Sequence, residues 1–324
     1  MSDRKITVLT DPIPTTYQYY SHQIMGRVRP LLRRLDKKEP LRKPLYGGHY
    51  AVTRSLIEGL DKARIAFVYN PRKIKDCTEE VIVLAGLTTL QQAIALREKG
   101  IIKKLAAGPN IVNLPSDRPE IIGSPFIDHY ILNSEWIKDI YIQDMPSLGA
   151  RAVLWPAGVD EQFWKPEVTE KAPGTMLFYS KRPEKKLFAT CRDIAEKSGF
   201  SVTVLDYGRY APQQYKELLD RNSIMVHFVE QETQGISLAE AWSMNVPSLV
   251  WNPGTFLTKG MNFISSSAPY LSDETGLFFH DAAQFEEVVT KLTAQPLEFK
   301  PREWVLQHLT DEIAARNLLD LLGF

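Results

Sequence analysis

The chain has 324 residues, with 39 basic and 39 acidic side chains and a hydrophobic content of 44%. This length suits two domains with well-packed cores, and the balanced charge argues against a general nucleic-acid-binding protein. Cys77 and Cys191 lie far apart and have no metal-ligand spacing, which is typical of an intracellular protein. There is no apolar run of ~18 residues and no signal-peptide core, so we expect a cytoplasmic chain.

The first half of the chain alternates expected strands with expected helices. Short runs rich in β-branched residues predict buried strands, and apolar residues three or four apart predict helices. The expected strands are 6–10, 64–69, 81–84, 128–132 and 151–154. The expected helices are 51–62, 90–98 and 135–141. Such alternation is typical of a parallel, doubly wound sheet.

A basic segment, residues 27–43, carries eight lysine and arginine side chains against Asp36 and Glu39. It also has an apolar side. Such a segment suits a peripheral contact with an anionic membrane surface or with an acidic acceptor. A solvated basic helix that covers the protein's own core explains the same pattern, and we favour this second interpretation.

The pair Gly47-Gly48 precedes the expected helix 51–62. Backbone without side chains can approach a ligand closely, and the start of a helix favours anions. An ordinary turn has the same composition, so both interpretations stay open.

The second half repeats the alternation after a polar linker at 167–174. The expected strands are 176–179, 201–205, 224–229, 248–251 and 275–279, and the expected helices are 213–221, 285–293 and 304–322. We therefore expect an N-terminal Rossmann-like domain (1–166), a C-terminal Rossmann-like domain (175–300) and a C-terminal helical segment (301–324) that returns to the N-terminal domain. His227, within an apolar strand, is interpreted as an interior or cleft-edge histidine.

The most informative stretch follows strand 224–229. Ligands of open parallel sheets bind at the carboxyl ends of the strands. A helix that starts near Gly235, Ile236 and Ser237 would point unpaired N–H groups at a phosphate there. Glu232 and Glu240 bracket this turn. A nucleotide sugar would need such a pair, with one carboxylate on the sugar side of the diphosphate and one on the ribose side. A surface loop and the polar face of a helix would give the same spacing.

The order of the motifs resembles glycosyltransferase family 4, whose members use nucleotide sugars and have the GT-B architecture of two Rossmann-like domains. The similarity covers about 134–290. It is carried by Ser134-Glu135-Trp136, Pro156–Asp160 with Phe163 and Pro166, Arg182 with Lys185, Gly208, Glu232 with Glu240, the stretch 240–247, and Gly276-Leu277. The chain departs from the family at Ala157, where the family has Asn, and at Asn245, where it has Gly. The spacing of Arg182 and Lys185 is compressed, so Lys186 is an alternative to Lys185.

The resemblance implies transfer of a sugar from a nucleoside-diphosphate sugar, with retention of configuration. Arg182 and Lys185 would neutralise the leaving diphosphate. Glu240 would hold the ribose, and Glu232 would contact the donor sugar. The chain contains no Asp-x-Asp pair, which favours a mechanism without a metal, and we expect no cofactor besides the donor co-substrate.

Several points stay open at this stage. The acceptor could be a glycan, a lipid or a small molecule, and the oligomeric state is undetermined. Base and sugar recognition would depend on loops 207–210 and 252–261. The alternatives are another enzyme of the same fold, such as a sugar-nucleotide epimerase or a phosphorylase, and a non-catalytic nucleotide-sugar-binding protein.

Overall fold

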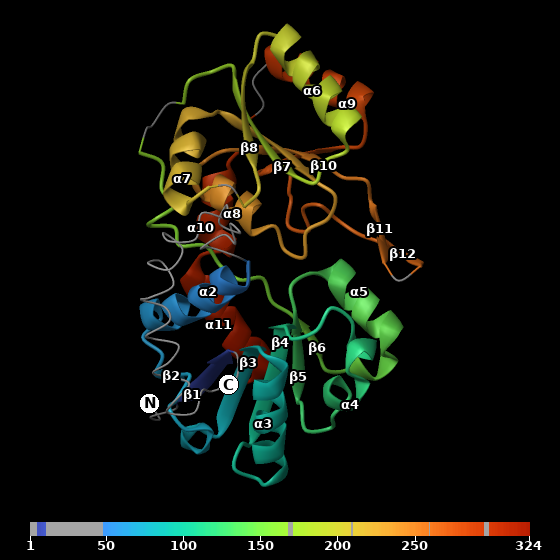
Figure 1. Ribbon diagram of the computed structural model, residues 1–324. Coiled ribbons are helices and arrows are strands. Elements are labelled where there is room, and N and C mark those ends of the chain that lie inside the picture. The colour runs from blue at the N-terminus through green and yellow to red at the C-terminus, as the bar shows by residue number, and fades with distance from the viewer. Residues whose placement is uncertain (1–4, 11–47, 168–170, 209, 259, 295–297) are drawn as a thin grey trace, which may run out of the picture.

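The computed structural model describes residues 5–10, 48–167, 171–208, 210–258, 260–294 and 298–324. Gly47 and the basic segment 27–43 lie outside these residues. Figure 1 shows two α/β lobes, one above the other, which we call the N-terminal and the C-terminal lobe. Each lobe has one parallel sheet covered by helices, so the predicted doubly wound α/β class is confirmed. Among the described residues no helix is both long enough and apolar enough to cross a membrane.

The N-terminal lobe contains a six-stranded parallel sheet of order β2-β1-β3-β4-β5-β6. Its strands are β1 (Ile6–Thr10), β2 (Phe67–Tyr69), β3 (Glu80–Ala85), β4 (Lys104–Asn110), β5 (His129–Leu132) and β6 (Ala152–Leu154). The helices are α2 (Gly48–Lys62), α3 (Leu87–Glu98), α4 (Pro119–Ile122) and α5 (Glu135–Asp144). The strand order reverses between β1 and β3, the kind of switch point beside which open sheets bind ligands.

The C-terminal lobe contains a five-stranded parallel sheet of order β13-β10-β9-β7-β8. Its strands are β7 (Thr175–Lys181), β8 (Ser201–Asp206), β9 (Ile224–Val229), β10 (Ser248–Trp251) and β13 (Gly276–Phe279). Its helices are α6 (Lys185–Lys197), α7 (Pro212–Arg221), α8 (Ile236–Ser243), α9 (Ala282–Ala294) and α10 (Pro301–His308). Here the switch point lies between β7 and β9, which are adjacent, so the loops that follow these two strands are neighbours.

A short antiparallel hairpin, β11 (Thr255–Thr258) with β12 (Met261–Ile264), extends from the C-terminal lobe toward α5 (Figure 1). Phe256 and Phe263 are a cross-strand pair on its inner face. Both phenylalanines pack in the cluster around Trp136 of α5. The sequence predicted only a loop here, because the two strands are short and their apolar partners come from the other lobe.

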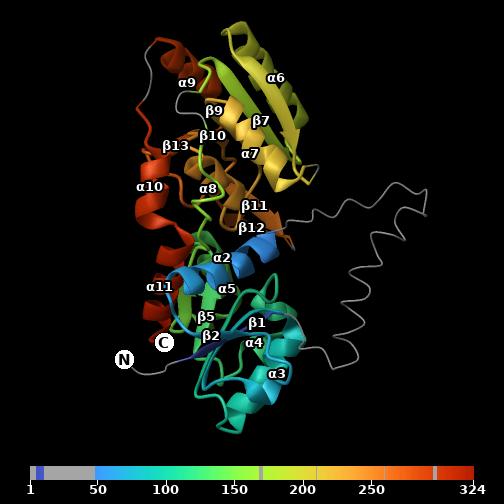
Figure 2. The same ribbon diagram turned by 90° about the vertical axis from the view of Figure 1, so that its left-hand side faces the viewer.

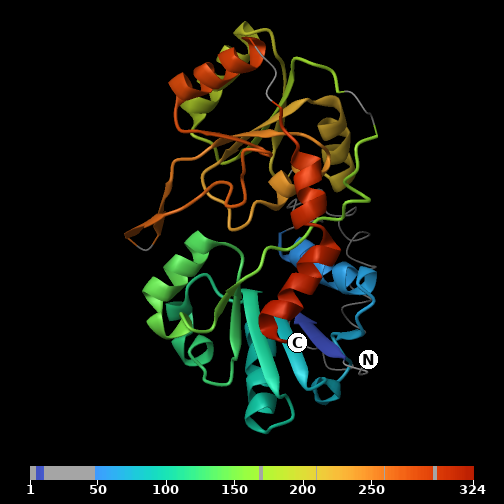
Figure 3. The same cartoon turned by 180° about the vertical axis from the view of Figure 1, so that it is seen from behind.

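The chain crosses between the lobes twice, and the two crossings lie side by side. The expected single helix 304–322 is two helices, α10 and α11 (Asp311–Leu322), which Figures 2 and 3 show in succession from one lobe to the other. The break forms because the Thr310 hydroxyl caps α11, accepting from Ile313 N at 3.3 Å. Val159 of the first crossing also donates to Leu309 O at 2.9 Å and accepts from Asp311 N at 3.1 Å. Helix α11 then packs on α2 through an apolar cluster.

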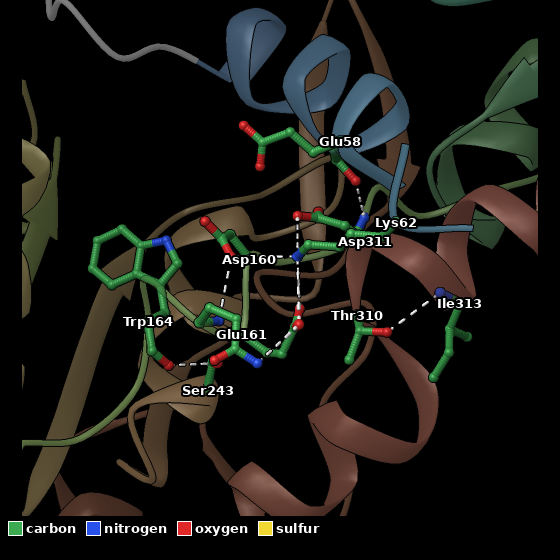
Figure 4. Close-up of polar contacts among 12 residues, drawn as sticks. Glu58, Lys62, Asp160, Glu161, Trp164, Ser243, Thr310, Asp311 and Ile313 are labelled. Carbon is green, nitrogen blue, oxygen red and sulfur yellow. Dashed lines mark hydrogen bonds and ion pairs between the residues drawn. The ribbon is translucent and has the colours of Figure 1, made fainter. Parts of the chain in front are cut away.

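A buried charge network fixes this double crossing (Figure 4). Asp311, whose side chain is fully buried, accepts from Arg54 of α2 at 2.7 and 3.2 Å. Lys62, one helical turn after Glu58, reaches Asp160 at 3.3 Å and Asp311 at 3.6 Å. Burial alone would lower the pKa of Lys62, but its hydrogen bond to Glu161 and the neighbouring carboxylates raise it. Lys62 therefore stays charged, and each crossing is tied to α2 by an ion pair.

We predict that Asp311→Asn destabilises the protein by about 3–5 kcal/mol, because it removes the fully buried carboxylate that pairs with Arg54 and leaves the half-exposed Glu58 as a counter-charge. Denaturant unfolding followed by circular dichroism measures this. The matched control is Asp320→Asn on the exposed face of the same helix, which should stay within about 0.5 kcal/mol of wild type. Equal stability of the two variants would show that the network does not hold the crossing.

Candidate functional site

A cleft of about 910 Å³ lies between the two lobes and is the largest cavity found among the described residues. This volume is near the upper end of the ~300–1,000 Å³ range of ligand pockets, which suits a site for two substrates. A smaller cavity of about 490 Å³ lies beside the linker. The N-terminal wall comes from the starts of α2 and α5 and the loop after β4. The C-terminal wall comes from the ends of β7 and β8, the loop after β9 and the start of α8.

Four helices point their N-termini at this cleft. Its lining includes Gly48 of α2, Leu87 of α3, Trp136 of α5 and Ile236 of α8, each in the first turn of its helix. The convergence follows from the topology, since in a parallel α/β sheet every helix starts near the carboxyl end of the preceding strand. The first N–H groups of a helix have no intrahelical partner, and the helix dipole adds a partial positive charge there. The cleft is therefore suited to an anionic ligand.

Helix α8 starts at a left-handed residue. Gly235 has φ +85°, and a Cβ atom on it would lie 3.2 Å from the Leu238 side chain. Only glycine adopts this conformation without strain, and its carbonyl accepts from Leu238 N at 3.0 Å and Ala239 N at 3.1 Å. Ile236 and Ser237 follow directly and line the cleft. The predicted phosphate-binding turn thus faces the space between the lobes.

Glu232 is held on its backbone from both sides. Its N–H donates to Ser266 O at 3.0 Å, and its carbonyl accepts from Trp136 Nε1 of the other lobe at 3.0 Å. Its carboxylate forms an ion pair with Lys181 at 3.0 Å. The Lys181 ammonium also lies over the Tyr207 ring, 5.0 Å from its centroid. A cation and a carboxylate therefore stand together in the cleft, beside the start of α8.

Gln234 connects the two lobes. Its buried amide exchanges two hydrogen bonds with the backbone of Ala157 on the first crossing, accepting from N at 2.9 Å and donating to O at 2.6 Å. Asn133 donates to the same amide oxygen at 3.5 Å. The Tyr270 hydroxyl donates to Asn133 O. These contacts fix the loop after β9 against the N-terminal lobe, so the width of the cleft depends on them.

Glu240 is buried on α8 and faces a group of tyrosines. Burial raises the pKa of Tyr210 well above its ordinary value; the hydrogen bond with Tyr179 opposes this shift, and the Glu240 charge adds to it. Tyr179 and Tyr210 join their hydroxyl groups at 3.0 Å, and the Tyr215 hydroxyl donates to Ser237 O at 2.8 Å. These phenols therefore stay protonated and act as hydrogen-bonding groups along the C-terminal wall.

His227 lies beneath this wall and is fully buried. Its ring stacks on Tyr179, with centroids 5.3 Å apart and planes 4° from parallel. Neither ring nitrogen has a hydrogen-bond partner among the described residues. Burial, and secondly the positive charge of Lys181, lower the pKa of His227 to about 3. The imidazole is therefore neutral at physiological pH, in agreement with its interpretation as an interior histidine.

The structure places the described members of the predicted site in three positions: lining the cleft, beside it, and outside it. Glu232, Glu240, Gly235, Ile236, Ser237 and Gly48 line the cleft. Gly208, with φ +77°, lies beside it and lines a small adjoining cavity together with Tyr207, Tyr210 and Glu240. Arg182, Lys185 and Lys186 are exposed and lie outside the lining. Gly47 is not among the described residues.

Lys181, which the motif comparison passed over, is the lysine that lines the cleft. Alternation along β7 provides the signal for it, because residues two apart share a face of a strand. Leu177 and Tyr179 pack into the core beneath the cleft, and Lys181 continues that face. Arg182 follows with φ +56° and turns away.

Gln234→Ala should destabilise the protein by about 1–3 kcal/mol, because the buried backbone groups of Ala157 lose their partners. Denaturant unfolding measures the change. Thr233→Ala, at the exposed neighbouring position, is the matched control and should behave as wild type. If both variants unfold at the same denaturant concentration as wild type, the amide does not fix the lobes.

Acid should destabilise the protein through His227. Because its folded-state pKa lies below the unfolded value of ~6.5, the unfolded chain binds the extra proton between about pH 6.5 and 3. Stability should therefore fall as pH drops through this window, by at most ~1.4 kcal/mol per unit from this residue. Unfolding free energies at pH 7 and pH 5 should show a smaller loss for His227→Phe than for wild type. Parallel losses would contradict this role.

No protein-family model matches the sequence, and no curated protein matches it either. Solved structures of low sequence identity do match over the whole chain. Anabaena HepE in complex with UDP and glucose has a TM-score of 0.56 at 11% identity and covers 98% of this chain and 99% of its own. A glycosyltransferase from Rickettsia africae has a TM-score of 0.59 at 10% identity, covering 99% and 98%. The lipopolysaccharide outer core galactosyltransferase WaaB has a TM-score of 0.58 at 12% identity, and the match covers 99% of each chain.

At sequence identities of 10% to 12%, the structural similarity shows that the fold is shared. It spans both lobes and the two crossings between them, and it agrees with the two parallel sheets described above. The chain has the GT-B architecture of two Rossmann-like lobes around a cleft, as the motif order predicted.

Proposed function

We propose that the protein is a glycosyltransferase that moves a sugar from a nucleoside-diphosphate sugar to a hydroxyl group of an acceptor. One observation carries the proposal. Lys181 and Glu232 form an ion pair at 3.0 Å in the interlobe cleft, which the first turn of α8 also lines. A diphosphate leaving group needs fixed positive charge, and a donor sugar needs a carboxylate to bind its hydroxyl groups. The cleft provides both within one site.

Lys181 and the N-terminus of α8 would stabilise the charge that develops on the departing diphosphate. Such stabilisation acts strongly when the donors are fixed before the reaction and water is largely excluded. Lys181 is only about one-third exposed. A bound diphosphate would compete with Glu232 for its ammonium group. The carboxylate would then be released toward the sugar.

The two glutamates would have separate tasks. Glu232, within the loop that follows β9, would accept hydrogen bonds from the donor sugar. Glu240, in the second turn of α8, would accept hydrogen bonds from the ribose hydroxyls.

We further propose a retaining reaction without a metal ion, in which a phosphate oxygen of the leaving group takes the acceptor proton. Lys181 and the helix dipoles supply the positive charge for it. Within the described chain, the one cluster of three acidic groups that has metal-ligand geometry lies at the crossing, where Arg54 and Lys62 neutralise it.

The ligands of a structural neighbour support the choice of donor class. HepE has been solved with UDP, with UDP and glucose, and with UDP-glucose. UDP-sugars are therefore the first donors to test, and UDP is the first product ligand to test.

The proposal distinguishes two adjacent cations. Lys181→Met should lower the rate of sugar transfer or donor hydrolysis by roughly 100-fold, as loss of one charge-stabilising donor does in other enzymes. Arg182→Met, the matched control at the next position, should keep nearly full activity because Arg182 lies outside the cleft lining. Release of nucleoside diphosphate from UDP-sugars gives the rate. The reverse pattern, with Arg182 essential and Lys181 dispensable, would assign the diphosphate to the motif arginine instead.

A further inference from the structure

The acceptor side of the cleft, formed by the N-terminal lobe, has a largely aliphatic wall. Side chains from the first two turns of α2, the start of α3, the loop after β4 and one face of α5 contribute to it. They are Val52, Leu87, Pro109, Ile111, Val112, Leu114, Ile137 and Ile140. Several of them, including Ile111, Val112 and Ile137, are only partly buried by the protein itself. Their remaining apolar surface faces a cleft that is large enough to hold a second substrate.

The loop that presents this wall is held in place. The Tyr141 hydroxyl donates to Val112 O at 2.6 Å. Leu114 N donates to the Asp117 carboxylate at 3.0 Å. Because these contacts fix the backbone, the aliphatic side chains form a defined surface. The polar and charged residues of the same loop region, Asn113, Asp117 and Arg118, are exposed and line the rim.

The opposite wall is different in chemistry. The C-terminal lobe contributes Lys181, Glu232, Glu240 and the hydroxyl groups of several tyrosines. Where an acceptor composed only of sugar contacts the aliphatic side chains, it would lose hydrogen bonds to water, which costs free energy. Replacements on this wall could come only from its polar lining residues, such as His49, Asn110 and Asn133. An apolar group there would instead gain roughly 0.8 kcal/mol for each buried methylene. The asymmetry therefore favours an acceptor with an apolar body.

The apolar surface continues at the hairpin β11–β12. Phe256 of its inner face lines the cleft and meets Trp136 edge-on, with ring centroids 6.2 Å apart. On its outer face, Leu257 is 70% exposed and Ile264 is 84% exposed. These are the two most exposed large apolar side chains in the described part of the molecule. An acceptor whose apolar body is longer than the cleft could therefore make further apolar contacts with this hairpin.

We propose that the acceptor is an amphiphilic alcohol, whose apolar body lies along the aliphatic wall while its hydroxyl group faces Glu232 and the donor. The inference rests on the proposed glycosyltransferase function and specifies the substrate class of the same cleft. It commits to one of the three acceptor classes that the sequence left open: lipid-like molecules that carry a free hydroxyl group.

The test is a calorimetric titration with n-alkanols from butanol to octanol, made in the presence of saturating UDP. Each added methylene should tighten binding by roughly fourfold, which is ~0.8 kcal/mol converted with RT of ~0.59 kcal/mol. Glucose and maltotriose, titrated in the same way, should bind much more weakly than octanol. Absence of a chain-length dependence while UDP still binds, or tight binding of the sugars alone, would overturn the inference and leave the donor site intact.

Matched variants locate the binding surface. Ile111→Asn in the wall should reduce the gain per methylene to about half or less, and Val112→Asn is a second wall variant in case the first does not fold. Ile101→Asn, a partly exposed isoleucine outside the lining, should keep the wild-type dependence. Equal dependence in the wall variants and the control would place the alkyl chain elsewhere and overturn the inference. If none of UDP, ADP and GDP binds, the proposed function fails first; if only ADP or GDP binds, that diphosphate replaces UDP in the titration.

Discussion

The cleft depends on one constraint, the side-by-side passage of the two chain crossings. Val159 and Thr310 lie in register as backbone partners, and a Cβ atom on Gly158 would stand 2.5 Å from Thr310 O. Arg54 and Lys62 of α2 hold the buried Asp311 and the half-buried Asp160 at this point. Because the crossings connect the lobes and are attached to one helix, the separation of the two sheets is set here. The first turn of that same helix reaches the cleft.

The cleft in turn assembles groups that neither lobe could bring together alone. The N-terminal lobe supplies helix starts and an aliphatic wall, and the C-terminal lobe supplies Lys181, Glu232 and Glu240. Direct contacts hold the facing loops together: Trp136 donates to the Glu232 carbonyl, and Gln234 pairs with the backbone of Ala157. The charged groups of the C-terminal lobe and the aliphatic groups of the N-terminal lobe therefore lie on opposite walls, and under the proposed function the donor and the acceptor would meet at the boundary between them.

Local patterns in the sequence predicted most of the fold. Strand and helix periodicities are properties of short segments, so the alternation of both lobes and the turn at Gly235 could be read directly. Features that depend on residues far away in the sequence could not be predicted in this way. The hairpin at Phe256 packs on α5, and the break before Asp311 depends on Val159, 150 residues earlier. In the site, both glutamates and the start of α8 were predicted to be together. The choice of Arg182 followed motif order alone, whereas the alternation of β7 would have indicated Lys181.

The central claim is that the interlobe cleft binds a nucleoside diphosphate through the start of α8 and Lys181. Isothermal titration of the wild-type protein with UDP, ADP and GDP tests it most directly. The account predicts saturable binding of at least one of them at one molecule per chain, with affinity that falls as salt rises because the contacts are ionic. It also predicts that the corresponding nucleoside, which lacks the phosphates, binds far more weakly. Failure of all three diphosphates to bind, or equal binding of nucleoside and diphosphate, would contradict it.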